Sequence, residues 1–431
     1  MAYIYNDQSA GDRALSSKIN ALSVATGRKI DDGLYPEQAA RYVVFVEGGL
    51  YHYRDCHTGA VSTGNANAAT VIHAARDLLT AGRTWKETIV LKGDFYTIET
   101  LLFGSYTRIV LDGMITATAT MAAMIRTVPN TQFFEFTGGT LWGNKTFISC
   151  GYGIYVPHYT DYLEVDDYAD PSNYFHDVIV ADFTKGVVEG SRKTSYQRVI
   201  ITNCTEGFWF ISDATDSIVT DVYVKACQGN GFHVEGKWIR FKDCISDHNT
   251  GVGVLMKGWG NSWDGGYIEY AGGNGVTFAQ WFFDNSVRNT HILENTGYGV
   301  HIDGGFSLYV SQNNFLGNAY AIYEEGVSYN NTIINNQVDE NDDTCVFVAL
   351  ASSGDVIHGN IGFLMESKGI STGTAAQQTI AHGLAGIPTY VFFSNIENGA
   401  NPYQSAAADI TNIYVTAGNG LDYAWNAIHE P

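Results

Sequence analysis

A glycine recurs at intervals of 21 to 24 residues through the middle of this chain, and this repeat limits the possible folds more than any other feature. The glycines are Gly186, Gly207, Gly231, Gly253, Gly275 and Gly299, and each opens a short alternating run such as NGFHVEG or YGVHIDG. Every repeat holds a second such run, for example WIRFKDC at 238–244. A fixed period of this length is typical of stacked units that bury one continuous core.

The runs have the period of strands rather than of helices. Apolar and polar residues alternate, and Val, Ile, Phe, Tyr and Thr are frequent. Proline is absent from 172 to 387, as expected where backbone N–H groups all join strand ladders. Asparagine recurs between the runs, where it favours turns, at Asn230, Asn249, Asn274, Asn295 and Asn318. We therefore predict one coil of a parallel β-helix per repeat.

Both ends of this stack have their own patterns. Residues 67–82 predict a helix that covers the first coil, with Asn67 as N-cap and Ile72, Ala75 and Leu79 on one face. Residues 12–25 predict another short helix. The repeat stops near 365, and short strands with tight turns then predict a small antiparallel β-domain. The expected division is an N-terminal segment 1–40, a β-helix 41–365 and a C-terminal domain 366–431.

Composition excludes several classes of protein. Aromatic residues make up 13% of the chain, which disordered chains do not reach, and a net charge of −21 disfavours nucleic-acid binding. No apolar stretch is long enough for a transmembrane helix, and the first residues do not resemble a secretory signal. The six cysteines lack the spacing of a zinc site, so we expect Cys204, Cys227 and Cys244 to be buried free thiols.

The order of capping helix, TIVLKGDFYTIET strand, LDG turn and 21–24-residue coils resembles the right-handed parallel β-helix of the pectin-lyase-like superfamily. Within that superfamily it is similar to viral tailspike depolymerases and related archaeal or bacterial polysaccharide-acting proteins, over roughly residues 41–431. The resemblance implies an all-β fold, glycan binding or cleavage on the outside of the helix, a homotrimer, and an extracellular or virion-associated location.

Three departures from the superfamily bear on the reaction. The paired-aspartate motifs of polygalacturonases are not recognisable, and the calcium-binding aspartates of pectate lyases are not evident. The segment YGIYVPH at 152–158 is similar to the YG-x-DPH motif of alginate epimerases, but it has an extra residue and lacks the aspartate. The fold therefore does not choose the reaction.

Alternation from each repeat glycine assigns side chains to two faces of a strand. From Gly207 to Gly299, the first and third residues after each glycine are apolar and should point inward. The second should point outward, giving the column Trp209, His233, Leu255, Thr277 and His301. The fourth gives the column Ile211, Glu235, Lys257, Ala279 and Asp303, and we expect the next coil to add Ile322 and Glu324 to this outer face.

Outward carboxylates favour a glycoside hydrolase that needs no cofactor. Asp303 and Glu324 should lie on successive coils about 4.8 Å apart, close to the spacing of the carboxyl pair in retaining glycosidases. Glu235 could pair instead with Asp213 or Asp216 in the adjoining turn. His301 is a further catalytic candidate on the same face.

A polysaccharide lyase is the alternative enzyme. His233, Glu235 and Lys257 form a compact outward trio that could remove a proton beside a uronate carboxylate, and a divalent cation could assist. A simple Glu235–Lys257 ion pair is the competing interpretation. The net charge of −21 repels polyuronates, so hydrolysis is favoured.

Tryptophans gather beside the same outer face. Five of them, Trp209, Trp238, Trp259, Trp263 and Trp281, are expected either to stack on sugars or to pack against a neighbouring subunit. A fibre that binds glycan without cutting it, or a structural stalk, therefore stays open beside the two enzymes.

Overall fold

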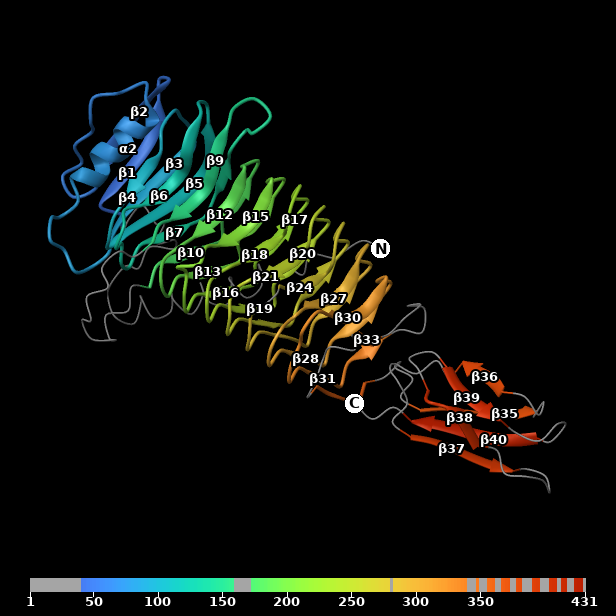
Figure 1. Cartoon of the computed structure of the whole chain (residues 1–431). Helices are drawn as coiled ribbons and strands as arrows, with labels where there is room; N and C mark the ends of the chain where they lie inside the picture. The colour runs from blue at the N-terminus through green and yellow to red at the C-terminus, as the bar shows by residue number, and fades with distance from the viewer. Residues whose placement is uncertain are drawn as a thin grey trace, which may run out of the picture.

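The computed structural model describes residues 40–158, 172–279, 282–338, 346–348, 355–360, 366–372, 377–381, 390–395, 403–408, 412–416 and 422–428. Within this part the chain is a parallel β-solenoid with one helix, as predicted, and its coils stack along one axis (Figure 1). The helix expected at 12–25 lies outside the described residues. No helix of the described residues is long and apolar enough to cross a membrane.

One wall of the solenoid is a parallel sheet of eleven strands, here called sheet B. Each coil contributes one strand, and neighbouring coils pair in register (Figure 1). In spatial order from the N-terminal end, the strands are β4 (Leu101–Phe103), β6 (Met121–Thr127), β9 (Cys150–Val156), β12 (Lys185–Glu189), β15 (Glu206–Phe210), β18 (Phe232–Val234), β21 (Val254–Met256), β24 (Val276–Phe278), β27 (Tyr298–Asp303), β30 (Tyr320–Glu325) and β33 (Val346–Val348).

The rest of each coil belongs to a 23-stranded sheet, here called sheet A. Its first strands are β1 (Tyr42–Glu47), β2 (Leu50–Asp55), β3 (Glu87–Thr97) and β5 (Thr107–Ala117), where β1 and β2 form an antiparallel hairpin. The later coils each contribute two short strands: β7 (Glu135–Thr137), β8 (Thr140–Trp142), β10 (Tyr174–His176), β11 (Ile179–Ala181), β13 (Ser195–Gln197), β14 (Ile200–Thr202), β16 (Ile218–Thr220), β17 (Tyr223–Lys225), β19 (Arg240–Lys242), β20 (Ile245–Asp247), β22 (Ser262–Asp264), β23 (Tyr267–Glu269), β25 (Ser286–Arg288), β26 (His291–Leu293), β28 (Tyr309–Ser311), β29 (Asn314–Leu316), β31 (Thr332–Ile334), β32 (Gln337–Val338) and β34 (Val356–His358).

The bend between these two short strands is a left-handed backbone residue in successive coils. Asp177, Arg198, Asp221 and Asp243 have φ between 50° and 60°. The predicted asparagines Asn295 and Asn318 are not the bend residues. Both are buried, and they form a hydrogen bond between adjacent coils, in which Asn295 Nδ2 donates to Asn318 Oδ1 at 2.9 Å. The left-handed turn falls instead on the preceding residue, at His248 before Asn249 and at Glu294 before Asn295.

The repeat glycines are needed because the coils approach each other closely there. A Cβ at Gly207 would lie 2.2 Å from the carbonyl oxygen of Gly231, and one at Gly253 would lie 2.6 Å from that of Gly275. Both distances are shorter than a van der Waals contact, so a larger residue would force the strands apart. The repeat seen in the sequence thus reflects the spacing of the coils.

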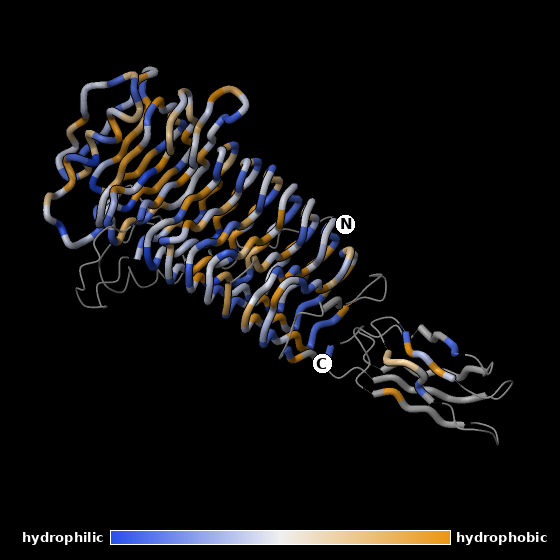
Figure 2. Tube along the Cα trace, viewed as in Figure 1, coloured by the Kyte–Doolittle hydropathy of each residue, from blue (hydrophilic) through white to orange (hydrophobic). Residues whose placement is uncertain are grey.

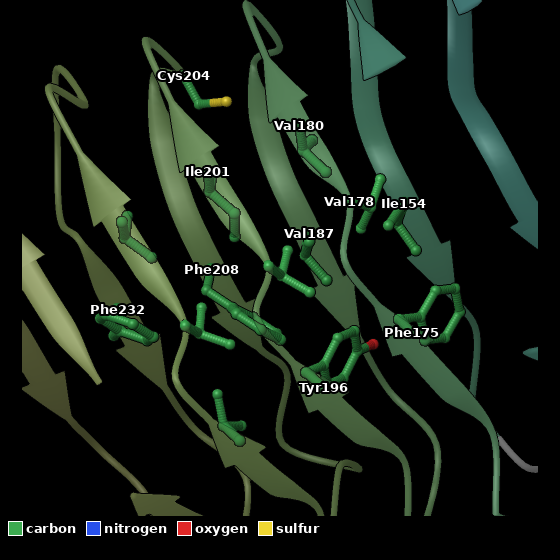
Figure 3. Packing of buried hydrophobic residues seen from close by; sticks show 14 of the residues in the cluster. Ile154, Phe175, Val178, Val180, Val187, Tyr196, Ile201, Cys204, Phe208 and Phe232 are labelled. Carbon is green, nitrogen blue, oxygen red and sulfur yellow. The ribbon is translucent and has the colours of Figure 1, made fainter. Parts of the chain in front are cut away.

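The core is a column of inward side chains that runs the length of the stack. All ten residues predicted to point inward from sheet B, including Phe208, Phe232 and Ile302, are fully buried. Figure 3 shows Val187, Phe208 and Phe232 stacked inside successive coils, and Figure 2 shows the accompanying alternation of hydropathy along each strand. Because no coil can bury its own apolar side, the neighbouring coils supply most of the stability.

Helix α2 (Ala68–Asp77) packs against the N-terminal end of the stack, where it was predicted. Asn67 is its N-cap, and the side-chain oxygen accepts from the backbone N–H of Ala69 at 2.9 Å. Ile72 and Ala75 are buried, and the helix ends earlier than predicted, at Asp77. The end of the solenoid is therefore covered by the apolar face of α2.

The C-terminal strands form two small antiparallel sheets, as predicted. One contains β35 (Glu366–Thr372), β40 (Asp422–Ile428) and β37 (Tyr390–Asn395), and the other contains β36 (Gln377–Ala381), β39 (Asn412–Thr416) and β38 (Tyr403–Ala406). The exact domain boundaries stay a prediction. Of the predicted thiols, Cys204, Cys227 and Cys244 are free and buried, as expected.

Candidate functional site

The outer face of sheet B carries the two predicted columns in register. Cα pairing aligns Trp209 with His233, then Leu255, Thr277 and His301 on the following strands. These side chains are partly exposed while their strand neighbours are buried. The alternation therefore places the outward candidates correctly up to β27.

A charged and aromatic group, here called the His233 group, lies on strands β12 to β21. The His233 ring stacks on Trp209 with centroids 4.9 Å apart and planes 2° apart, and the Lys185 ammonium lies 3.0 Å from the centroid of the Trp209 ring. His233 Nε2 is 3.2 Å from Glu235 Oε1, so Glu235 pairs with the histidine and not with Lys257. The alternative of a simple Glu235–Lys257 ion pair is therefore wrong.

Burial and charge act together on the His233 group. Desolvation lowers the pKa of His233, Glu235 opposes that effect, and Lys257 and Lys185 reinforce it. Desolvation also lowers the pKa of Lys185, against the attraction of Glu206 and Glu235. A neutral imidazole with two lysines in its surroundings can accept a proton beside an anionic substrate.

A pair of carboxylates lies further along the same face, but it is not the predicted pair. The register places Asp303 beside Glu325, and these are the last residues of β27 and β30. His301 Nε2 lies 2.9 Å from Glu325 Oε1, and the other ring nitrogen, Nδ1, lies 3.2 Å from Asn274 Nδ2. Asn274 Oδ1 accepts from the backbone N–H of Tyr298 at 2.9 Å. This fixes the amide, so Nδ1 is the acceptor and Nε2 donates to Glu325.

The prediction that Glu324 and Ile322 point outward is wrong. Glu324 pairs in the sheet with buried Ile302, is fully buried, and accepts from Asn331 Nδ2 at 3.1 Å. The repeat glycine Gly299 stacks on Ala321, whereas outward Ile322 and Glu324 would require Tyr320 at that position. A shift of one residue moves every side chain of a strand to the opposite face.

Three tyrosines lie on the same two strands as Asp303 and Glu325. Tyr298 and Tyr323 stack with centroids 4.3 Å apart, and Tyr320 meets Tyr323 edge-on at 5.6 Å. Desolvation raises the pKa of Tyr298, and Tyr323 and Glu325 add to the effect. Phenol groups beside carboxylates offer hydrogen bonds to sugar hydroxyls.

Asp213 lies at the corner beyond β15 and faces another histidine. Its Oδ2 is 3.4 Å from His158 Nδ1, at the end of the YGIYVPH segment. The alternative partner Asp216 accepts from Thr215 Oγ1 at 2.9 Å. The pairing of Glu235 with either aspartate stays a prediction.

The five predicted tryptophans differ in position, and the prediction that Trp263 binds sugar or a neighbouring subunit is wrong. Trp263 is fully buried in β22, where it packs on Phe241 and Phe232, so it cannot bind a sugar. Trp281 lies outside the described residues. Trp209 lies on sheet B as predicted, but His233 and Lys185 cover its two faces.

Trp238 and Trp259 lie at the corner between the sheets and begin an aromatic stripe. Trp259 stacks on Phe283 at 5.3 Å, and Phe306 stacks on Tyr329 at 5.5 Å. Trp238 meets Trp259 edge-on at 4.6 Å. We call Trp238, Trp259, Phe283, Phe306 and Tyr329 the corner stripe. The stacked pairs Trp259–Phe283 and Phe306–Tyr329 cover ring faces and leave ring edges exposed.

Sequence reasoning missed Lys185, Glu325 and the three tyrosines. Lys185 and Glu206 are Cα partners one place before their repeat glycines, so a third column counted from the glycines would have found Lys185. Glu325 would also have been found by treating Ala321 as a repeat glycine, because Glu325 is the fourth residue after Ala321. Among the described residues, no group of three or more His, Cys, Asp or Glu side chains is placed to hold a metal ion.

Comparison with known proteins supports the same fold. The profile of a family described as a right handed beta helix region matches residues 187–338. No match was found among curated proteins. The predicted right-handed parallel β-helix is thus confirmed.

Three solved structures have a similar fold at low identity. The A-module of mannuronan C-5 epimerase AlgE6 from Azotobacter vinelandii aligns with a TM-score of 0.57 and 14% identity, over 68% of this chain and 95% of that one. The AlgE4 A-module from the same organism gives 0.51 and 15%, over 70% and 98%. The enzymatically active domain of tailspike protein 2 from bacteriophage CBA120 gives 0.52 and 14%, over 90% of this chain and 63% of that one. At these identities the likeness concerns the fold alone.

Proposed function

We propose that this protein binds a polysaccharide along the outer face of sheet B and hydrolyses its glycosidic bonds at Asp303 and Glu325. The observation that carries the proposal is the register that sets these two outward carboxylates side by side on adjacent strands. Adjacent strands lie about 4.8 Å apart. Carboxyl groups in retaining glycosidases are about 5–5.5 Å apart, so a retaining reaction fits best.

The contacts favour separate roles for the two carboxylates. His301 donates to Glu325 and holds one orientation of that carboxylate. Glu325 is therefore the better nucleophile, which would attack the anomeric carbon and form a glycosyl ester. Asp303 would give its proton to the leaving oxygen and then take one from the water that cleaves the ester.

A second candidate function is a β-elimination by the His233 group on a uronate-containing glycan. It is favoured by the lowered pKa of His233 between Lys185 and Lys257. The neutral imidazole would remove the C5 proton, the ammonium groups would neutralise the uronate carboxylate, and the 4-O-linked sugar would leave. The epimerases of similar fold act, by their names, on mannuronan. A divalent cation could assist either binding or elimination.

Product chemistry separates the two functions. Purified protein is incubated with neutral glycans (xylan, dextran, laminarin) and acidic glycans (alginate, polygalacturonate), and both reducing ends and absorbance near 235 nm are followed. Hydrolysis releases reducing ends alone, whereas elimination adds the absorbance of an unsaturated uronate. The proposal expects the first result, with loss of at least about a hundredfold in Asp303→Asn and Glu325→Gln.

Matched variants keep this test specific. Glu294→Gln removes an exposed carboxylate at another corner and should leave the rate unchanged. His233→Gln should also leave hydrolysis unchanged, but it would abolish elimination. Equal activity of Asp303→Asn, Glu325→Gln and the parent protein would refute the hydrolytic site.

We also propose a homotrimer that packs through the corner stripe. Phe283 and Tyr329 are 41% and 39% exposed, and ring edges suit a protein partner better than a sugar face. Light scattering should give three times the 47.1 kDa chain mass, and Phe283→Ser with Tyr329→Ser should lower it. A monomeric parent protein would refute this arrangement. The tailspike of similar fold supports a virion-associated or extracellular location.

A further inference from the structure

A cavity of about 520 Å³ lies at the edge of sheet B, next to Lys185 of the His233 group and away from the Asp303–Glu325 pair. It is bounded by the 143–149 loop between β8 and β9 and by the corners that precede β12, β15 and β18. Cavities of about 300–1,000 Å³ are the usual size for binding small molecules. The residues that line this cavity indicate the class of ligand that it would bind.

The loop over this cavity is anchored to the solenoid. The backbone N–H groups of Gly143 and Lys145 donate to the carbonyls of Ala181 and Asp182 at 2.8 and 3.0 Å. The Lys145 ammonium donates to the carbonyl of Asn203, one coil further along. These bonds fix the base of the loop and so position Phe147.

Phe147 is 81% exposed, the largest exposure of any large apolar side chain in the described residues. It lines the cavity although it contributes almost nothing to the core. An aromatic ring held in solvent at the mouth of a polar cavity suits stacking on the C–H face of a sugar. The ring faces of Trp209, by contrast, are already covered.

Apart from Ile148, the remaining lining is polar, and it contains no carboxylate. Thr184, Thr205 and Ser149 provide hydroxyl groups, Gln228 an amide and Lys145 an ammonium group. Hydroxyl and amide groups both donate and accept, which matches the many hydroxyls of a sugar better than an apolar ligand. The ammonium group adds attraction for a sugar carboxylate.

We propose that this cavity is a binding subsite for one sugar residue of the glycan, with Phe147 stacking on the sugar and Lys145 facing its hydroxyl or carboxyl groups. The inference rests on the proposed function for its ligand class. Thr184 and Thr205 directly precede β12 and β15. The subsite therefore opens beside the N-terminal ends of these two strands. From β12 to β27 is five strand spacings, about 24 Å. The subsite would therefore hold long chains and leave short ones unaffected.

Binding tests this subsite independently of cleavage. A glycan array that includes neutral and acidic oligosaccharides identifies a ligand for the Asp303→Asn protein, and calorimetry then measures its affinity. Phe147→Ala in that background should weaken binding of a long glycan about tenfold, as expected for an aromatic anchor. Tyr96→Ala, which removes an aromatic ring that is 53% exposed on β3, is the matched control and should bind as the parent does. Lys145→Met should weaken acidic glycans more than neutral ones.

The outcomes separate the subsite from the reaction. Weakened binding in Phe147→Ala, with no cleavage by the parent protein, would refute hydrolysis and support the subsite. Cleavage by the parent protein with equal affinities for Phe147→Ala and Tyr96→Ala would overturn the subsite. Failure to bind any glycan on the array would overturn it as well.

Discussion

Glu189 at the end of β12 gives a prediction whose size follows from the structure. The side chain is fully buried on the inner face of sheet B, between Val156 and Phe210 on the neighbouring strands. Tyr196 Oη donates to Glu189 Oε2 and the Ser191 N–H donates to Oε1, both at 2.5 Å. Burial nevertheless dominates and raises the pKa of Glu189 from 4.5 to about 7.

The direction of the stability change follows from this raised pKa. The folded protein prefers the protonated carboxyl, so the full stability is present below pH 4.5 and is lost as pH rises through about 7. A difference of about 2.5 pKa units corresponds to about 3 kcal/mol in the free energy of unfolding. For a cooperative unit of about 300 residues this is about 5 °C in the melting temperature.

Glu189→Gln removes this titration and keeps the shape. The amide oxygen can accept from the Ser191 N–H, and the amide nitrogen can donate to Tyr196 Oη in place of the O–H of the protonated carboxyl. Melting temperatures from pH 4 to pH 9 should show the variant gaining about 5 °C on the parent protein across this range. Glu294→Gln, which removes an exposed carboxylate, should follow the parent profile. If Glu189→Gln also runs parallel to the parent, the reasoning about the buried carboxylate is wrong.

Three further predictions concern single side chains. Trp263→Ala should lower the free energy of unfolding by about 3–5 kcal/mol in a denaturant titration, because it empties a core site, and a change below about 1 kcal/mol would contradict its burial. Glu235→Gln should lower the pKa of His233 further, since Glu235 opposes the desolvation; an NMR titration that shows no change or a rise would contradict the pairing. Arg198 holds the pKa of Asp177 at about 2, so the stability is present above pH 3.8 and is lost as pH falls toward 2. Arg198→Met should therefore move acid unfolding to higher pH, and an unchanged midpoint would contradict the contact.

The glycine spacing and period-2 alternation were enough to predict the solenoid, because both follow from the close stacking of coils. The same columns placed His233 and Asp303 correctly. They failed at Glu324, where Ala321 occupies the glycine column and hides the register. A column with one substituted member cannot be aligned from spacing alone, since a one-residue change reverses the face.

Trp263 was misplaced for a different reason. It was expected beside the outer face of sheet B, but it is the central residue of β22 and pairs in register with Phe241 and Val287. Comparing RFK, SWD and SVR would have shown an inward central position. The His233–Glu235 contact and the cavity under Phe147 depend on side-chain conformation and loop path, which periodicity does not contain.

The most direct test of the account is a crystal structure of the Asp303→Asn protein soaked with an oligosaccharide that the parent protein cleaves. The proposed reaction predicts sugar along the outer face of sheet B, with one glycosidic oxygen near position 303 and its anomeric carbon within reach of Glu325. Sugar bound at another face of the solenoid, with Glu325 remote from every anomeric carbon, would contradict it.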